Sequence, residues 1–151
     1  MISDIFNILL PQFILGFCIL ILLILSMVLS PRLYKYARMV AIVGISAAIV
    51  FLSTVQTEPQ YFGFQNSIMA DSYTLLFDFI ILFCGFLVSL LSKNLVRTIK
   101  SQAYTFYAVF LSAILGAMSV VSANDFITLL ISLELLGFST YFLISVSKGY
   151  H

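Results

Sequence analysis

The sequence predicts an all-α integral membrane protein with five transmembrane helices, on the evidence of its composition, its apolar runs and its charge pattern. Of the 151 residues, 62% are hydrophobic and 9% are charged, and the mean hydropathy is +1.16. A soluble domain is about one-quarter charged and about half apolar. Five apolar runs are each close to the roughly 17–25 residues with which a helix spans the hydrocarbon of a bilayer. The solvent of this chain must therefore be lipid or other lipid-embedded protein.

A single membrane domain is expected over residues 1–151, with helices at approximately residues 9–29, 39–55, 73–91, 104–121 and 126–146. The first helix tolerates Pro11 in its opening turn, where the missing N–H has no helical partner. The third helix follows Asp71, whose side chain is expected to cap it by accepting a hydrogen bond from the first turn. Only residues 122–125 join the last two helices, which must form a tight antiparallel hairpin. The longest connection, residues 56–72, is expected to be an ordered loop on the outer face that covers neighbouring helices.

The charged residues outside the helices separate by side of the membrane. In an alternating topology one face carries all seven basic residues, Arg32, Lys35, Arg38, Lys93, Arg97, Lys100 and Lys148. The opposite face carries Asp4, Glu58, Asp71 and Asp125. Because Lys and Arg are enriched in cytoplasmic loops, the N-terminus is predicted outside, in the intermembrane space or periplasm. The C-terminus is then predicted inside, in the matrix or cytoplasm.

Several kinds of site and signal are not supported by the sequence. The segment before Arg32 has no basic residue, so neither a secretory signal nor an Arg-rich transit peptide is expected. The basic residues form no stripe or long run of the kind that binds nucleic acid. Cys18 and Cys84 lie inside apolar runs and are expected to be reduced packing residues. The single histidine is His151, the last residue, and no metal or cofactor site is expected.

Glu134 is an acidic residue inside a predicted membrane helix. It lies eight residues into the helix at 126–146, near mid-membrane at about 1.5 Å per residue. An ionised carboxylate at that depth costs a few kcal/mol or more. It must therefore take up a proton or pair with a cation. We interpret Glu134 as a proton-path residue; the alternative is a static interhelical hydrogen bond or a buried ion pair.

Two further polar residues are expected near the acidic face. Asp78 lies five residues into the helix at 73–91, roughly 7–8 Å below that face. It is a second candidate for a proton-path role; the alternatives are that its side chain reaches the surface or bonds to a hydroxyl of a neighbouring helix. Gln12, near the outer end of the first helix, is expected to form an interhelical hydrogen bond.

Small residues indicate where the last two helices touch. At helical spacing the fourth helix carries Ser112, Ala113, Gly116 and Ala117, and the fifth carries Gly137, Ser139 and Thr140. Small side chains let helix backbones approach closely in a membrane, where no hydrophobic force drives helices together. Both sets are predicted to be packing surfaces.

With these helices placed, the chain resembles subunit 2 of proton-pumping NADH:ubiquinone oxidoreductase (respiratory complex I). The resemblance is carried mainly by residues 119–143, SVVSANDFITLLISLELLGFSTYFL. The family has an S-A-x-D hairpin followed by an L-E-L glutamate at mid-membrane, which is Glu134 here. The stretch at 9–12, LLPQ, is similar to the family's L-P-E, although Gln12 replaces the carboxylate. Asp71 and the residues after it are similar to the start of the family's third helix.

The resemblance implies that this chain is the N-terminal piece of subunit 2, as a split chain or a fragment. Family members have roughly fourteen helices, and their glutamate works beside a lysine on a later helix. Such a lysine is absent from the helices here, so another chain would bring it, together with the later helices. Glu134 would then take part in proton translocation coupled to NADH oxidation by ubiquinone. Other membrane-arm subunits and lipids would be its partners, and the mitochondrial inner membrane, or a bacterial plasma membrane, its location.

Three other interpretations remain open. The antiporter-like subunits 4 and 5 and the Mrp-type antiporters carry a glutamate in the equivalent helix. The chain is also compatible with a structural membrane subunit of a large complex, in which Glu134 is inert. An independent transporter working as a homo-oligomer would have only Glu134 and Asp78 as deep charges. Under the complex I interpretation the chain belongs to an H⁺-translocating reductase but carries no redox chemistry or cofactor itself.

Overall fold

The computed structural model describes residues 2–28, 34–54, 61–63, 67–98 and 102–148. It contains five long helices, α1 (Ile2–Val28), α2 (Tyr34–Thr54), α3 (Ser72–Leu91), α5 (Ala103–Ser122) and α6 (Phe126–Lys148). Each is long and apolar enough to cross a membrane, which confirms the predicted class of five membrane helices. The connections add a short helix, α4 (Lys93–Thr98), and two strands, β1 (Tyr61–Gly63) and β2 (Ile68–Ala70).

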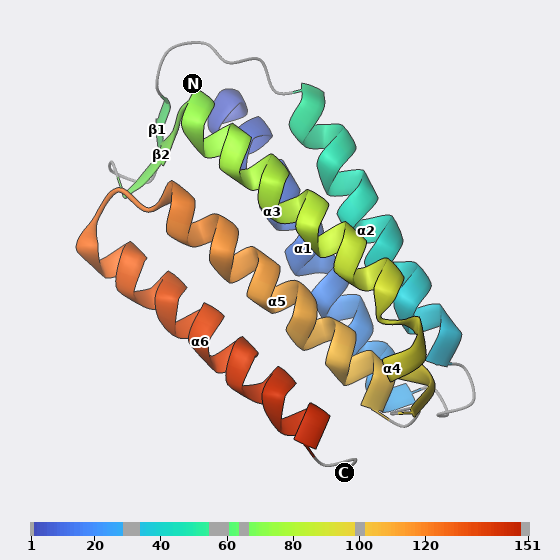
Figure 1. The fold of residues 1–151 in the computed structure, drawn as a ribbon. Helices are drawn as coiled ribbons and strands as arrows, with labels where there is room; N and C mark the ends of the chain where they lie inside the picture. Colours follow the sequence, from blue (N-terminus) through green and yellow to red (C-terminus); the bar gives the residue numbers. More distant parts are fainter. Residues whose placement is uncertain (1, 29–33, 55–60, 64–66, 99–101, 149–151) are drawn as a thin grey trace.

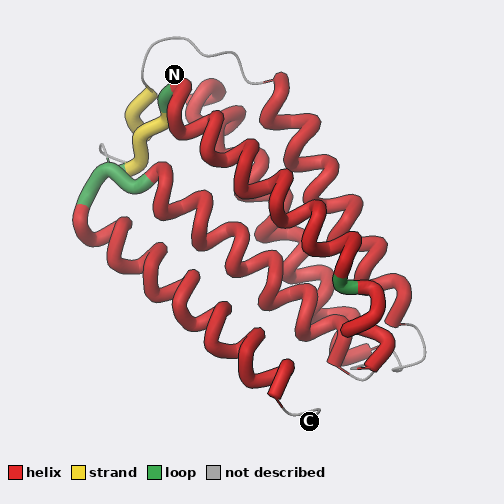
Figure 2. The backbone as a smooth tube through the Cα atoms, in the orientation of Figure 1, coloured by secondary structure: helices red, strands yellow, loops and turns green. Residues whose placement is uncertain are grey.

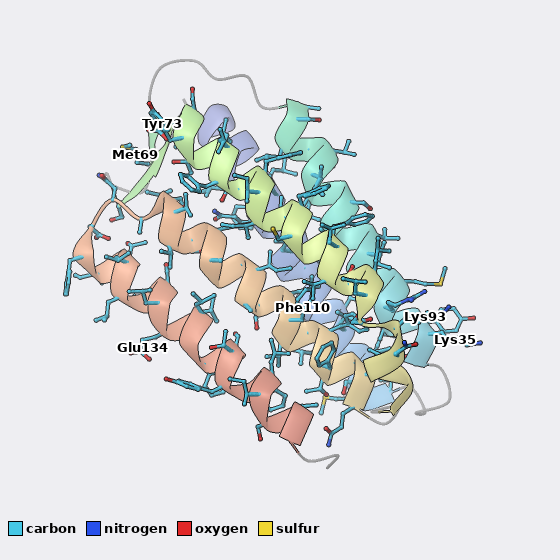
Figure 3. The ribbon with its side chains drawn as sticks, in the orientation of Figure 1. Lys35, Met69, Tyr73, Lys93, Phe110 and Glu134 are labelled. Atoms are coloured by element: carbon cyan, nitrogen blue, oxygen red, sulfur yellow. The ribbon has the colours of Figure 1, made fainter. Side chains whose placement is uncertain are left out.

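The long helices lie side by side as a bundle with one helix at its edge (Figure 1). Helix α5 is central, because it contacts α1, α2, α3 and α6. Helix α6 packs mainly against α5 and forms the edge of the molecule (Figure 2). We call the end of the bundle that holds Asp71 and Asp125 the acidic end. The basic end, where Lys35 and Lys93 lie, is opposite (Figure 3).

Two helices begin earlier than their apolar runs. Helix α1 begins at Ile2 instead of residue 9, so Pro11 lies inside the helix and not in its opening turn. Helix α2 begins at Tyr34 instead of residue 39. The added turn of α2 carries Lys35 and Arg38, and long basic side chains can lie along apolar surface while their charges reach water. The apolar run therefore predicts only the part of a helix that lies in the hydrocarbon, and both of these helices begin before it.

The connection at the acidic end contains a small antiparallel hairpin. Strands β1 and β2 pair Tyr61 with Ala70 and Gly63 with Ile68. Ile68 also forms a β-bridge with Ala123, in the turn between α5 and α6. The described part of the segment 56–72 thus lies against the α5–α6 turn; residues 55–60 and 64–66 are outside the described residues.

Helices α1 and α2 approach closely where a glycine meets a cysteine. A Cβ atom added at Gly44 would lie 2.6 Å from Sγ of Cys18, so a larger residue at position 44 would have to displace this thiol. Cys18 is half-buried and is a packing residue, as predicted. For Cys84 only the packing part of the prediction was wrong, because this residue is exposed on α3. Both thiols are free.

The outer surface of the bundle is apolar. Large side chains such as Phe17, Ile24 and Phe83 are exposed, while the core combines large side chains such as Tyr107 and Leu15 with small ones such as Ala41. An extended apolar exterior of this kind fits a lipid environment or further membrane protein, because a soluble monomer rarely exposes large apolar patches.

Candidate functional site

Glu134 lies on the side of α6 that faces away from the bundle. The inward side is marked by Ser132 and Ser139, which are 4% and 1% exposed. Glu134 is two residues from Ser132, about 200° around the helix axis, and its side chain is exposed. Figure 3 shows it pointing away from α5. The carboxyl group is therefore at an outer surface of the described bundle, although it lies about 12 Å along the helix from Phe126.

Close contact with α5 fixes the position of α6. A Cβ added at Gly116 would lie 3.0 Å from the backbone nitrogen of Leu136 and 3.2 Å from its Cα, so the two backbones nearly touch there. The hydroxyls of Ser112 and Ser139 are 2.9 Å apart and share a hydrogen bond. The predicted packing surface is confirmed at these positions.

Two other small residues of α6 do not contribute to this contact. A Cβ at Gly137 would meet nothing within 4 Å. Thr140 is exposed, and its hydroxyl donates to the carbonyl of Gly137 at 2.8 Å. The prediction was wrong for both, because neither residue lies on the side of α6 that faces α5.

The first turn of α6 is capped by Asp125, which is also hydrogen-bonded to Ser67, beside the β1–β2 hairpin. The backbone N–H of Thr128 donates to Oδ1 of Asp125 at 2.8 Å, and the hydroxyl of Ser67 donates to Oδ2 at 3.2 Å. The N–H of Asn124 donates to the carbonyl of Ser67 at 2.9 Å. The side chain and backbone of Thr128 lower the pKa of Asp125 by hydrogen bonding to its ionised form. Sequence reasoning treated Asp125 only as a loop charge; an Asp three residues before Thr128 at a helix start was the signal for the cap.

Asp78 lies inside the bundle, on the face of α3 that also buries Thr74, Leu82, Gly85 and Ser89. It is 5% exposed, and its Oδ1 atom has no hydrogen-bond partner among the residues that the structure describes. The two alternatives to a proton-path role, in which Asp78 reaches the surface or bonds to a neighbouring hydroxyl, are not found among the described residues. The inward face of α3 therefore carries a carboxyl group near the acidic end of the bundle.

Asp71 caps α3, as predicted. Its Oδ1 accepts hydrogen bonds from the backbone N–H of Thr74 at 2.8 Å and from the hydroxyl of Thr74 at 2.9 Å. These bonds, the backbone one first, lower the pKa of Asp71. Gln12 also behaves as predicted, because its Nε2 donates to the hydroxyl of Ser122 across α1 and α5 at 3.4 Å.

The two membrane carboxyl groups are not brought together. Asp78 faces the interior formed by α3 and its neighbours, whereas Glu134 faces outward from α6 on the far side of α5. No Lys or Arg occurs between residues 39 and 91 or between 103 and 147. Within the described part of the chain, no three His, Cys, Asp or Glu side chains come close enough to hold a metal ion.

These features define a multi-pass helical membrane protein whose edge helix carries an outward-facing carboxyl group. No protein-family model matches the chain. The chain does match individual proteins along most of its length. The chain is 30% identical to the chloroplastic NAD(P)H-quinone oxidoreductase subunit 2 of Chlorokybus atmophyticus, over 93% of this chain and 27% of the relative. It is 33% identical to NADH-quinone oxidoreductase subunit N of Anoxybacillus flavithermus (strain DSM 21510 / WK1), over 94% of this chain and 29% of the relative.

A third relative, the chloroplastic subunit 2 of Nephroselmis olivacea, is 33% identical over 93% of this chain and 29% of its own length. The chain is homologous, over nearly all of its length, to the N-terminal part of subunit 2 (subunit N) of the NAD(P)H-quinone oxidoreductases, a complex I subunit. The resemblance inferred from the residues is thereby confirmed. The chain spans less than a third of the length of these relatives.

Proposed function

We propose that this chain supplies the first five helices of subunit 2 in the membrane arm of a proton-pumping complex I. It contributes there to proton translocation coupled to NADH oxidation by ubiquinone. The observation that carries the proposal is the position of Glu134, which is halfway along an edge helix and faces away from all the helices described. A carboxyl group in contact with hydrocarbon is costly and is found facing protein or a water-filled cavity.

The surface around Glu134 supports a protein partner. Its neighbours on the outward side of α6 are large and exposed: Ile127 (67%), Leu130 (50%), Phe138 (71%) and Tyr141 (75%). An apolar helix face with one carboxyl group at its centre fits packing against another membrane helix that carries a polar or cationic group. We call this the outward face of α6. The relatives are more than three times longer than the chain, and their additional helices are its proposed occupants.

The proposed chemistry is reversible proton binding at Glu134. A lysine brought by the later helices stabilises the ionised carboxylate when it is close, and Glu134 then releases its proton. When the lysine moves away, the carboxylate in its low-dielectric surroundings takes a proton up. Redox cofactors belong, in this proposal, to other subunits of the complex.

The orientation and location follow the charge pattern. We place the acidic end, with Asp71 and Asp125, outside, and the basic end, with Lys35, Arg38 and Lys93, in the matrix or cytoplasm. The mitochondrial inner membrane and a bacterial plasma membrane are the predicted settings. The relatives reported above carry chloroplastic or bacterial names. Those names, subunit 2 and subunit N, support this assignment over the antiporter-like subunits 4 and 5 and the Mrp-type antiporters.

The test is the Glu134→Gln variant in the assembled complex. It removes the titratable group and keeps the shape of the side chain, so assembly is expected to stay intact while proton pumping per NADH oxidised falls sharply. Thr140→Val is the matched control, because Thr140 is an exposed polar residue of the same helix away from the outward face. Normal pumping by an assembled Glu134→Gln complex would contradict the proposal and favour a purely structural subunit. Recovery of the chain only as a small homo-oligomer after gentle detergent extraction would favour an independent transporter.

A further inference from the structure

Helix α3 and its C-cap residue, Ser92, bury a line of polar side chains that the proposed function does not use. Thr74, Asp78, Ser89 and Ser92 are 6%, 5%, 0% and 9% exposed. They recur at helical spacing, so all four share the face that packs into the bundle. Ser89 and Ser92 are satisfied, since their hydroxyls donate to the carbonyls of Phe86 and Ser89. Asp78 differs, because its Oδ1 has no partner among the described residues.

The depth of Asp78 can be read from the contacts between α3 and the antiparallel α5. The hydroxyls of Ser92 and Tyr107 are 2.8 Å apart at the basic end. Seven residues back along α3, Gly85 lies against Ile114, which is seven residues further along α5. One more step of the same size puts Asp78 level with residue 121 on α5, next to Ser122. Asp78 therefore lies at the acidic end of the bundle, at the level where Gln12 bonds to Ser122.

No described cation is placed to neutralise an ionised Asp78. Of the elements that pack against α3, α2 carries Tyr34, Lys35, Tyr36 and Arg38, α4 carries Lys93 and Arg97, and α5 carries Tyr104 and Tyr107. All eight positions belong to the basic end. Lys93 is fifteen residues along the chain from Asp78, about 22 Å of helix. Strand β2 has no titratable residue, and the remaining acid near the start of α3 is Asp71, which is negative. An unpaired buried carboxylate is strongly disfavoured, so the neutral acid is the stable form in these surroundings.

Polar groups connect Asp78 to the acidic end. Thr74 is one turn away on the same face, about 6 Å along the axis, and its hydroxyl donates to Oδ1 of the half-buried Asp71. In the other direction the same face continues with Leu82 and Gly85, which are buried. Gly85 packs against Ile114 and Ile45. Polar side chains, Thr74 and Asp71, therefore lie between Asp78 and the acidic end, whereas apolar packing separates Asp78 from the basic end.

We propose that Asp78 is a second proton-binding site of this membrane domain, loaded from the acidic end through Thr74 and Asp71. A proton that enters at Asp71 crosses by way of the Thr74 hydroxyl, with water as the relay, and forms the O–H bond of the Asp78 carboxyl group. Loading converts a buried negative charge to a neutral acid, and release reverses it. The site is independent of Glu134 and goes beyond the function proposed above, because it needs no lysine from another helix.

Infrared difference spectroscopy on the complete protein in its native complex tests this directly. A protonated aspartic acid has a carbonyl stretching band that moves when its proton is exchanged for deuterium. At neutral pH that band is expected in the wild type, is expected to be lost in Asp78→Asn, and is expected to disappear from the wild type at alkaline pH. Absence of a band that depends on Asp78 would overturn the site. Should Asp78→Asn fail to assemble, Asp78→Glu keeps the carboxyl group and must move the band instead of removing it.

The access route has its own test. Thr74→Val removes the hydroxyl and keeps the shape, so deuterium exchange at Asp78 is expected to slow while the band itself remains. Ser89→Ala is the matched control, because Ser89 is buried on the same face beyond the apolar segment and should leave the exchange rate unchanged. Equal exchange rates in Thr74→Val and the wild type, or a slower rate in Ser89→Ala alone, would overturn loading from the acidic end. Neither result depends on pumping activity, so failure here is distinguishable from failure of the Glu134 proposal.

Discussion

The Ser67 hydroxyl donates a hydrogen bond to Oδ2 of Asp125 at 3.2 Å, and this joins the hairpin segment to the first turn of α6. The other carboxylate oxygen of Asp125 caps that turn through the N–H of Thr128. One side chain thus fixes both where α6 begins and how the preceding connection lies over it. Because the rotation of α6 about its axis decides that Glu134 faces outward, the cap positions the candidate site from about 12 Å away.

Removal of this cap is expected to destabilise α6 selectively. Asp125→Ala loses the acceptor for Thr128 and for Ser67, whereas Asp125→Asn keeps a side chain that caps helices well. We expect a lower melting temperature for Asp125→Ala and a value close to wild type for Asp125→Asn, measured on the purified protein in detergent. Similar melting temperatures for all three proteins would show that the α5–α6 contact alone holds the helix.

The stability of the protein at acidic pH should depend on the two carboxylates that cap helices, Asp71 and Asp125. Hydrogen bonds lower the pKa of both Asp71 and Asp125 below the ordinary value of 3.8. A group whose pKa is lowered in the folded state stabilises the fold above its unfolded pKa, and the benefit is lost as the pH falls through its folded pKa. These two groups should therefore leave the melting temperature constant from neutral pH down to about pH 4. Below that pH the melting temperature should decrease as both carboxylates take up protons. The double variant Asp71→Asn with Asp125→Asn should lose that acid-side decrease; an unchanged decrease would assign it to other groups.

The five spans could be predicted because the length and polarity of an apolar run reflect the thickness of the bilayer. The side of each helix that faces inward could not be predicted. On α3 the buried Leu82 and the exposed Phe83 are equally apolar, since lipid is as apolar as the helix interior and the usual periodicity disappears. The burial of Asp78 was missed for this reason. The hairpin was missed because its strands have three residues each, too few for a recognisable alternation.

The two glycines near the α5–α6 contact should respond oppositely to the same substitution. Gly116→Ala puts a Cβ 3.0 Å from the Leu136 backbone nitrogen, and a backbone cannot give way as a side chain can. We expect a loss of about 1–3 kcal/mol in unfolding free energy, typical of overpacking. Gly137→Ala meets nothing within 4 Å, and alanine favours helix by about 1 kcal/mol over glycine. Denaturation in mixed micelles measures both; a Gly137→Ala protein as destabilised as Gly116→Ala would mean that the α5–α6 contact is not the one described.

The outward face of α6 should contact protein in the assembled complex. Phe138 is 71% exposed there, one turn from Glu134. A photoreactive phenylalanine analogue at position 138 is expected to cross-link to polypeptide, because lipid alone would leave Glu134 facing hydrocarbon at a cost of a few kcal/mol or more. The same analogue at Phe17, which is 65% exposed on α1, is the matched comparison for a bulky aromatic exposed elsewhere on the bundle. Peptide mass spectrometry identifies the adducts, and a protein adduct at position 138 that maps to a lysine-bearing helix would supply the proposed partner of Glu134. Lipid adducts alone at position 138 would leave the carboxyl group without such a partner and contradict its proposed role in proton transfer.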